Sequence, residues 1–352
     1  MRKESFEFLK RLMTTPSPSG FEQAAQEVCR EYVAPYVDKV YKDVHGNQFA
    51  VRNEGAALRV MLDAHVDEVG LMVKHIDDKG FISFDSIGGV DSAILGCQRV
   101  KVLGAKGAVP GVIGRKPPHV TEDDERGKAL KMHELWIDIA AKSKKDAGKY
   151  VAVGDPIVID VPFIEMANGS VCARGFDDRM GAFVILEAMR LLADRDIDCA
   201  VYCVTAVQEE VGCRGARTAA YGVHPDVALA VEFGWSTDHP SMDVKQFGER
   251  RIGKGPLISR GPNINPTIEK QLRSVADKKK IPYQIVPEPR GTPTDANPIQ
   301  LTRGGVATAL IRVPGRYIHS PVEVMRLRDA EFAAKLIAEW VAMLKPGMDF
   351  IP

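Results

Sequence analysis

The sequence lacks an excess of charge of either sign. Its 47 lysine and arginine residues balance 47 aspartate and glutamate residues, so the formal net charge is zero. A chain without net charge has no general electrostatic attraction to nucleic acid or to an anionic membrane surface. We therefore expect no nucleic acid and no membrane partner, and we look for function in a local site.

Long apolar segments are also missing. No stretch of the sequence approaches the roughly 20 apolar residues that a membrane-spanning helix needs. Residues 1–6 are charged and lack the apolar centre of a secretory signal peptide. A cytoplasmic location is the resulting expectation.

Cysteine is scarce, and the CxxC spacing typical of redox and zinc motifs does not occur. Several of the cysteines lie inside apolar, strand-like runs. We therefore expect reduced core residues, with no thiolate metal site. The six cysteines are Cys29, Cys97, Cys172, Cys199, Cys203 and Cys213.

Three common catalytic motifs are absent as well. The sequence contains neither the phosphate-binding GxxxxGK[ST] loop nor the GxSxG turn of serine hydrolases. His133 and Glu134 lack the second histidine of an HExxH zinc motif. Five histidines without comparable carboxylate neighbours are expected to be surface or structural residues: His75, His119, His133, His224 and His239.

The length of 352 residues predicts one large domain and a smaller one, because single cores stop growing at about 250–300 residues. Short Val-rich and Ile-rich runs separated by glycines fill residues 70–161, which is typical of a small all-β domain. We expect it to be inserted into a discontinuous domain formed by residues 1–69 and 162–352. Its most polar stretch, residues 116–131 with an acidic run at 122–126, predicts a mobile, solvated loop.

Helix and strand patterns alternate in the larger domain. Ser19, followed three residues later by Glu22, predicts the cap of a helix that continues to Tyr32. Residues 41–52 have the pattern of a hairpin. The alternation predicts an α/β fold with a mixed, largely parallel sheet covered by helices, in which ligands bind at the carboxyl ends of the strands. Further strands are expected at residues 58–62, 200–207, 227–233 and 306–313, and helices at 179–192, 214–221, 267–280 and 329–344.

Two adjacent carboxylates, Glu209 and Glu210, follow an apolar strand pattern. Successive side chains at a strand end point to opposite sides, so one glutamate can bind a metal while the other moves protons. Two charges at the end of a buried strand are costly unless they are paired or bind a cation. This pair therefore favours a catalytic metal site.

Other ligand candidates follow apolar runs or lie beside glycines. His65 and Asp67, two residues apart, can face one side of a strand, with Asp67 holding the second imidazole nitrogen. The alternative for His65 is a hydrogen bond to the local backbone. Asp177 can bind a metal while Asp178 caps the following helix.

Glu232 interrupts the end of an apolar run, and His319 lies in a loop after a predicted strand. The alternative for Glu232 is an ion pair with an arginine. Five ligand positions that are separated along the chain suggest two metal ions rather than one.

Taken together, these motifs resemble the M42 metallo-aminopeptidases, a family of glutamyl and tetrahedral aminopeptidases whose members are sometimes called endoglucanases. The resemblance runs through nearly the whole chain, and the combination and order of the motifs make it specific. It rests on PSGFE at residues 18–22, AHVDEVG at 64–70, FDDR at 176–179, QEEVG at 208–212, TDA at 294–296 and YIHS at 317–320.

The resemblance implies a phosphorylase/hydrolase-like metallopeptidase core and two divalent ions, zinc or cobalt with manganese as an alternative, bridged by Asp177. It also implies that Glu209 is the general base and that Asp67 is the partner of His65. The β-rich insert would be a dimerisation domain, and dimers would assemble into a hollow tetrahedral particle, commonly a dodecamer. The implied metal ligands are His65, Asp177, Glu210, Glu232 and His319.

Two positions depart from the family's usual residues: Glu232 stands where aspartate is usual, and Pro293 where glycine is usual. The leading expectation is an aminopeptidase that hydrolyses N-terminal residues from short peptides. The longer side chain of Glu232 motivates an alternative, a two-metal deacylase or carboxypeptidase acting on blocked substrates. A second alternative is a protein that is not an enzyme: a non-catalytic, metal-stabilised assembly subunit. Candidates to line a specificity pocket are Phe233, Trp235, Arg290 and Arg316.

Overall fold

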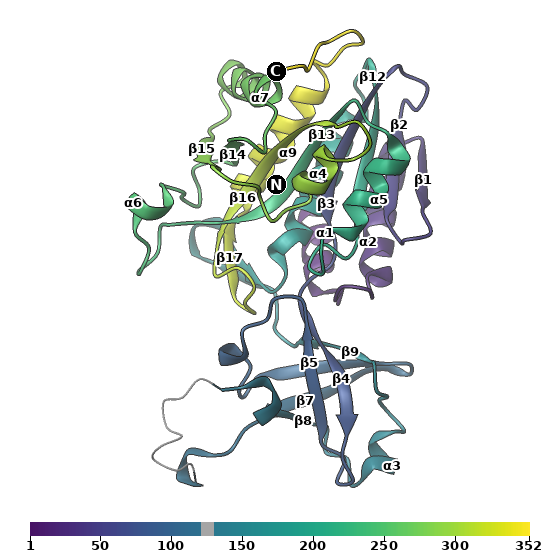
Figure 1. The fold of residues 1–352 in the computed structure, drawn as a ribbon, viewed down its shortest axis with the longest axis vertical. Coiled ribbons are helices and arrows are strands. Elements are labelled where there is room, and N and C mark those ends of the chain that lie inside the picture. Colours follow the sequence, from purple (N-terminus) through teal and green to yellow (C-terminus); the bar gives the residue numbers. More distant parts are fainter. Residues whose placement is uncertain (121–129) are drawn as a thin grey trace.

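The computed structural model describes residues 1–120 and 130–352, which form an α/β unit and a smaller β-barrel (Figure 1). Both chain termini lie in the α/β unit. The barrel strands fall between Gly70 and Ile159, so the barrel interrupts the α/β unit in the sequence. The acidic run predicted to form a mobile loop lies outside the described residues.

The α/β unit contains an eleven-stranded sheet. Its strands are β1 (Lys39–Lys42), β2 (Gln48–Arg52), β3 (Leu58–His65), β10 (Ile164–Met166), β11 (Ser170–Ala173), β12 (Cys199–Ala206), β13 (Val227–Trp235), β14 (Leu257–Arg260), β15 (Gln284–Pro287), β16 (Ala307–Arg316) and β17 (Glu323–Arg326). The main order is β1-β2-β12-β3-β13-β16-β17-β11-β10, and β14 pairs with β15 and β16. The central strands β12, β3, β13 and β16 run parallel, with antiparallel strands on both sides. The predicted mixed α/β fold is confirmed.

The smaller unit is a closed antiparallel barrel in the order β4-β5-β8-β7-β6-β9. Its strands are β4 (Gly70–Ile76), β5 (Ile82–Ile87), β6 (Arg99–Gly104), β7 (Gly107–Gly114), β8 (Trp136–Asp138) and β9 (Pro156–Ile159). Alternate residues such as Ile82 and Phe84 point into a separate apolar core, as the period of a strand requires. The expected small all-β insert is therefore present.

Helices cover both faces of the large sheet (Figure 1). The longer ones are α1 (Lys3–Thr14), α2 (Gln23–Val33), α4 (Phe176–Leu192), α5 (Arg214–Val223), α7 (Pro266–Lys279) and α9 (Leu327–Val341), and the short ones are α3 (Lys144–Ala147), α6 (Val244–Phe247) and α8 (Ala296–Gln300). On one face α4 packs against α9, β3 and β13, and on the other α5 and α8 pack against central strands. The helices predicted from the apolar spacing are all present within a few residues.

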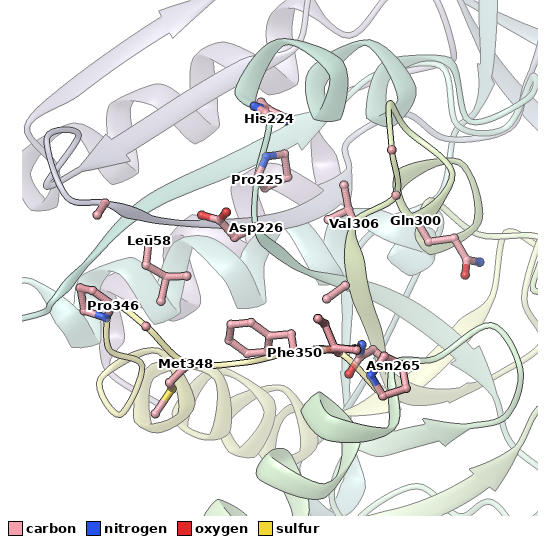
Figure 2. A pocket seen from close by; sticks show the side chains of 17 residues that line it. Leu58, His224, Pro225, Asp226, Asn265, Gln300, Val306, Pro346, Met348 and Phe350 are labelled. Atoms are coloured by element: carbon pink, nitrogen blue, oxygen red, sulfur yellow. Dashed lines mark hydrogen bonds between the residues drawn. The ribbon is translucent and has the colours of Figure 1, made fainter.

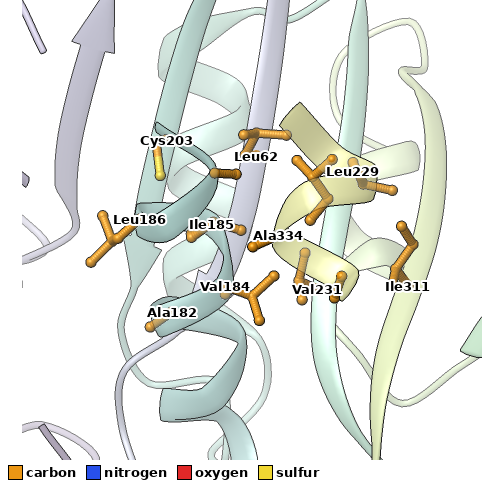
Figure 3. Packing of buried hydrophobic residues seen from close by; sticks show 14 of the residues in the cluster. Leu62, Ala182, Val184, Ile185, Leu186, Cys203, Leu229, Val231, Ile311 and Ala334 are labelled. Carbon is orange, nitrogen blue, oxygen red and sulfur yellow. The ribbon is translucent and has the colours of Figure 1, made fainter. Parts of the chain in front are cut away.

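The central strands are apolar on both sides because helices cover both faces. In β3, Val60 and Leu62 belong to the core under α4, whereas Met61 between them belongs to the core under α5. Figure 3 labels Leu62, Leu229 and Ile185 of α4, which belong to one apolar core. This packing brings the amino end of α4 to the strand ends where the candidate residues lie.

The predicted capping role of Ser19 is wrong. The helix begins after Glu22, whose side chain makes no cap hydrogen bond. The Ser19 hydroxyl instead donates to Asp67 Oδ2 at 2.6 Å, and Glu22 Oε1 accepts the Gln208 N–H at 3.2 Å. Tertiary contacts with the two strand ends have replaced the local capping interaction.

The expectation that all six cysteines lie in the core is wrong for two of them. Cys97 in the barrel is exposed, and Cys213 after β12 is partly exposed, while the other four are buried. None of the six forms a disulfide. In the part of the chain that the structure describes, no helix is long and apolar enough to cross a membrane.

Candidate active site

The predicted ligands meet at the carboxyl edge of the central strands. His65 is the last residue of β3, and Glu232 lies in the neighbouring parallel strand β13. The start of α4, the loop after β12 and the loop after β16 bring three more predicted ligands to the same place. These are Asp177, Glu210 and His319.

Asp177 lies between the two histidines. Its Oδ1 is 3.5 Å from His65 Nε2, and its Oδ2 is 3.0 Å from His319 Nε2. Glu210 Oε1 lies 3.3 Å from the same His319 nitrogen. Because this carboxylate lies between two imidazoles, each of its oxygens can bind a different cation.

Two groups of side chains offer ligand atoms that all lie within 4.8 Å of one another: His65 with Asp177 and Glu210, and His65 with Asp178 and Glu232. Imidazole and carboxylate ligands suit zinc and other divalent transition metals. The described residues therefore fit a divalent metal site at this edge of the sheet.

Asp178 does more than the sequence indicated. As predicted, its Oδ1 accepts the Gly181 N–H at 3.0 Å and caps the regular part of α4. Its Oδ2 is buried and has no hydrogen-bond partner among the described residues. A buried carboxylate oxygen without a donor is costly, and a bound cation would remove that cost.

Glu232 forms no ion pair with an arginine in the described part of the chain, so the structural alternative for this residue is not supported. Its Oε2 lies 3.7 Å from His65 Nε2, and its Oε1 accepts the Asp295 N–H at 3.2 Å. Burial raises the pKa of Glu232 well above its usual value, and the negative charges of Glu209 and Asp177 raise it further. This carboxylate faces other candidate ligands.

Asp67 connects the two strand ends. Its Oδ1 lies 3.5 Å from His65 Nδ1, and its backbone oxygen lies closer to that nitrogen, at 3.1 Å. The same carboxylate accepts the N–H groups of Glu209 at 3.0 Å and Glu210 at 3.2 Å. Burial alone would raise the pKa of Asp67, but His65 and Ser19 outweigh it and lower the pKa. Asp67 therefore remains a charged anchor for the glutamate pair.

Glu209 lies at the edge of the ligand cluster. Its Oε2 is 3.7 Å from His65 Nε2, and its Oε1 is 3.1 Å from Cys213 Sγ. Burial raises the pKa of Glu209 above its usual value, and the charges of Asp177 and Asp67 raise it further. A raised pKa brings a carboxylate closer to the range in which it exchanges protons near neutral pH.

The histidines hold protons strongly in this acidic environment. Contacts with Asp177 and Glu210 raise the pKa of His319 to about 11. Burial alone would lower the pKa of His65, but Asp177 and Asp67 raise it well above its usual value. Burial raises the pKa of Glu210 to about 7. The acidic side chains therefore attract positive charge to the point where the imidazole nitrogens meet.

The sequence matches the family model described as M42 glutamyl aminopeptidase over residues 46–336. The chain belongs to the M42 peptidase family. It is 35% identical to the lysyl aminopeptidase of Pyrococcus furiosus over 350 residues, which cover 99% of each chain. It is 29% identical to the glutamyl aminopeptidase of Lactococcus lactis, covering 93% of this chain and 92% of that protein. The protein is a peptide hydrolase of the aminopeptidase type.

Solved structures of TET aminopeptidases share the fold of this M42 peptidase. One from a marine sediment thaumarchaeon has a TM-score of 0.93 at 38% identity, covering 97% of each chain. The TET1 peptidase of Pyrococcus horikoshii, which can assemble into a tetrahedron or a large octahedral shell, has a TM-score of 0.87 at 31% identity. That match covers 97% of this chain and 100% of the other.

Two supporting carboxylates were not identified as site residues from the sequence. Glu68 lies 2.9 Å from Arg179 and 3.0 Å from Arg174, and these guanidinium groups are nearly inaccessible to solvent. Glu323 accepts the N–H groups of Phe176 at 2.5 Å and His319 at 2.9 Å. It also accepts the Asp177 N–H at 3.3 Å. The sequence feature that could have identified Glu68 as a site residue is its position in the AHVDEVG motif. No local pattern distinguished Glu323, because its donors belong to a segment far away in the sequence or to a loop.

A cavity of about 530 Å³ opens onto the ligand cluster of the M42 site. Glu209, Glu210 and His319 line one end, and Phe233 and Trp235 line the remainder together with charged residues. Phe233 and Trp235 were predicted to line a specificity pocket, whereas Arg316 pairs with Asp238 at 2.9 Å and Arg290 does not line this cavity. The sequence did not identify the charged residues that do: Arg250, Glu288 and Arg312.

A larger surface concavity, of about 710 Å³, lies at the opposite edge of the sheet (Figure 2). Two of its polar side chains already have structural roles. Asp226 accepts the Arg59 N–H at 2.8 Å, and Asn265 caps α7. None of the metal-ligating groups found among the described residues lies there. The candidate metal-ligating groups therefore lie at the carboxyl edge of the strands.

Proposed function

We propose that this chain is a two-metal aminopeptidase that removes N-terminal residues from short peptides, with Glu209 as the general base. The observation that supports the proposal best is the position of Asp177, whose two oxygens face the Nε2 atoms of His65 and His319. Glu210 and Glu232 would complete the ligand set, and Asp178 is an additional ligand candidate. The native ions in this proposal are zinc or cobalt, with manganese as an alternative.

The roles of the protein groups follow from their contacts. Bound divalent ions would supply Lewis acidity, which polarises a carbonyl group and acidifies water. Glu209 takes a proton from the attacking water and passes it to the leaving amine, because its carboxylate borders both the ligand cluster and the cavity. Asp67 orients His65 and holds the backbone of Glu209 through its accepted N–H bond.

One positive charge that lines the cavity, that of Arg250, favours an acidic N-terminal side chain in the substrate. Arg312 forms a short ion pair with Glu288, so these two charges compensate each other. Arg250 is 6% exposed, stacks 3.9 Å from the centre of the Trp235 ring, and has no hydrogen-bond partner at Nε in the described structure. An incompletely paired and nearly buried guanidinium favours a carboxylate as its partner. Of the glutamyl and lysyl activities named for the relatives, this cavity fits the glutamyl activity better.

We further propose a homo-oligomer in which the barrel at residues 70–161 serves as a dimerisation domain and the dimers form a tetrahedral dodecamer. The proposal rests on the similarity to the TET peptidases. Light scattering of the purified protein tests it: a mass of about twelve subunits supports the proposal, and a monomer contradicts it. A cytoplasmic location remains part of the proposal.

Initial rates on matched peptides test the activity. The panel contains aminoacyl amides and short peptides, each with a free and with an acetylated amino terminus, assayed after metal removal and after zinc or cobalt restoration. Metal-dependent cleavage of the free-amine members alone is expected. Cleavage of acetylated members would support the deacylase or carboxypeptidase alternative instead. Inactivity towards every substrate would contradict the aminopeptidase proposal and favour the assembly subunit.

A further inference from the structure

Beside Glu209 lies a group of metal-ligating atoms that includes Cys213, a residue with no part in the reaction proposed above. Cys213 Sγ is 3.1 Å from Glu209 Oε1. One ligand atom each from Glu209, Cys213 and Asp295 lies within 4.8 Å of the other two. The Cys213 N–H donates to the Glu209 carbonyl at 2.8 Å, so the turn that carries the thiol is tied to the turn that carries the base.

Asp295 supplies an independent indication of a missing ligand. Its side chain is 1% exposed, and neither carboxylate oxygen accepts a hydrogen bond from an N–H or hydroxyl group in the part of the chain that the structure describes. The side chain lies at hydrogen-bonding distance from the carboxyl group of Asp63. The neighbouring charged groups include Asp63, Glu209 and Glu232, which are also acidic. A buried carboxylate among other carboxylates must take up a proton or bind a cation.

Tetrahedral zinc has a sulfur ligand at about 2.3 Å and oxygen ligands at about 2.0–2.2 Å, which places neighbouring sulfur and oxygen ligands roughly 3.5 Å apart. The 3.1 Å from Cys213 Sγ to Glu209 Oε1 and the 4.8 Å limit for the whole group bracket this value. Small side-chain movements would bring all three ligands to bonding distance. Glu209 and Cys213 also line the cavity, so an ion can enter from it.

We propose that Cys213, Glu209 and Asp295 form a third, inhibitory metal site for a thiophilic divalent ion such as Zn²⁺ or Cd²⁺. On binding, a metal–sulfur bond forms and the thiol proton passes to solvent, with no change in oxidation state. An ion at this site occupies the carboxylate that would otherwise accept a proton from water. The inhibitory effect rests on the proposed function of Glu209 as base, whereas the binding of the ion does not.

Cadmium titration of the protein already loaded with its catalytic ions tests the site. The proposed catalytic ligands are imidazoles and carboxylates, so a thiolate-to-cadmium charge-transfer band in the ultraviolet reports a cysteine ligand. We expect the band in the wild type and in the control Cys97→Ser, which changes an exposed barrel cysteine. We expect no band in Cys213→Ser, which keeps a hydroxyl donor beside Glu209. Asp295→Asn should raise the cadmium Kd at least tenfold.

Absence of the band in the wild type, or an equal band in Cys213→Ser, would overturn the site. Circular dichroism checks that Cys213→Ser and Asp295→Asn are folded, and either folded variant alone is sufficient for the test.

The inhibitory role has a separate readout: excess Zn²⁺ should inhibit the wild type, and Cys213→Ser should need at least tenfold more zinc for the same inhibition. Unchanged zinc inhibition in that variant would overturn the inhibitory role. If the wild type hydrolyses no peptide even without excess zinc, the proposed function is contradicted. The cadmium band can still be interpreted in that case, because it reports binding of the ion and not activity.

Discussion

Glu209 differs from the neighbouring carboxylates in its contacts. Asp177 lies between two imidazoles, whereas Glu209 is farther from His65, at 3.7 Å, and touches Cys213 on its other side. A carboxylate that is accessible from the cavity and not enclosed by imidazoles can exchange protons with a substrate water. The two adjacent glutamates are thus placed for different tasks, although they share one local sequence.

Glu209→Gln removes the proposed proton acceptor while keeping the shape of the side chain. We expect kcat to fall by roughly 100- to 10,000-fold, the usual contribution of general acid–base catalysis. Metal content measured by mass spectrometry should remain that of the wild type. The exposed Glu7→Gln is the matched control and should be fully active. A wild-type rate in Glu209→Gln would show that another group is the base.

Arg250→Gln tests the proposed preference for acidic N-terminal residues. A hydrogen bond to a charged group contributes about 1.5–3 kcal/mol, so kcat/KM for an N-terminal glutamate should fall roughly 10- to 100-fold. The value for an N-terminal leucine should change much less. Arg251→Gln, at a neighbouring exposed arginine, is the control. Equal losses for glutamate and leucine substrates would assign Arg250 a structural role.

At the scale of elements, the site depends on the packing of α4 against the central strands. Leu229 of β13 is fully buried in this interface (Figure 3). Leu229→Ala should lower the free energy of unfolding by about 2–5 kcal/mol, because it removes buried methyl groups and leaves a cavity. Thermal unfolding measures the loss. Leu301→Ala, at a position 72% exposed, should change stability by less than about 0.5 kcal/mol; an equal effect of both changes would contradict the packing argument.

Glu339 connects α9 with two other segments, lying 2.8 Å from Arg195 and 2.7 Å from Lys279. The hydrogen bond from Arg195, followed by that from Lys279, lowers the pKa of Glu339 from 4.5 to about 2. A lowered pKa in the folded state means that the stabilisation is present above pH 4.5 and is lost as the pH falls towards 2.

Glu339→Gln should therefore lower the free energy of unfolding by about 1 kcal/mol at pH 7, since both partners are partly exposed. The difference from the wild type should shrink as the pH is lowered from 4.5 towards 2. Denaturation at several pH values measures it, with the exposed Glu4→Gln as control. A difference that stays constant over this range would show that the ion pairs are not its source.

At the scale of the whole molecule, the acidic cluster joins segments from both halves of the sequence. His65 comes from β3, Asp177 from the start of α4, and His319 from the loop after β16. Without cations, the carboxylates of these segments repel one another. We therefore expect metal binding to stabilise the folded chain.

Removal of divalent ions with a chelator should lower the thermal midpoint, and zinc should restore it. A ligand present at 100 times its Kd adds about 2.7 kcal/mol per site to the stability of the folded state. Scanning fluorimetry with and without chelator measures the shift, and His319→Ala should reduce it. An unchanged midpoint after verified metal loss would show that metal binding is not linked to folding.

The sequence by itself determined the fold class, the β-rich insert and the positions of the candidate ligands. These features depend on patterns within short windows: apolar runs of strand or helix period, and charged residues directly after them, as at His65 and Glu209. Charged residues that end apolar runs are costly to bury without a partner, so their positions in the sequence are sufficient to indicate a binding site.

Only the tertiary structure decided which residues from distant segments face one another. It placed Ser19 on Asp67 rather than at a helix cap, brought Arg250 into the cavity, and put Asp295 near Glu209 and Cys213. Such contacts depend on strand order and helix packing, so no local sequence pattern encodes them. The pairing of charges in space, and hence substrate preference and metal affinity, is a property of the folded chain.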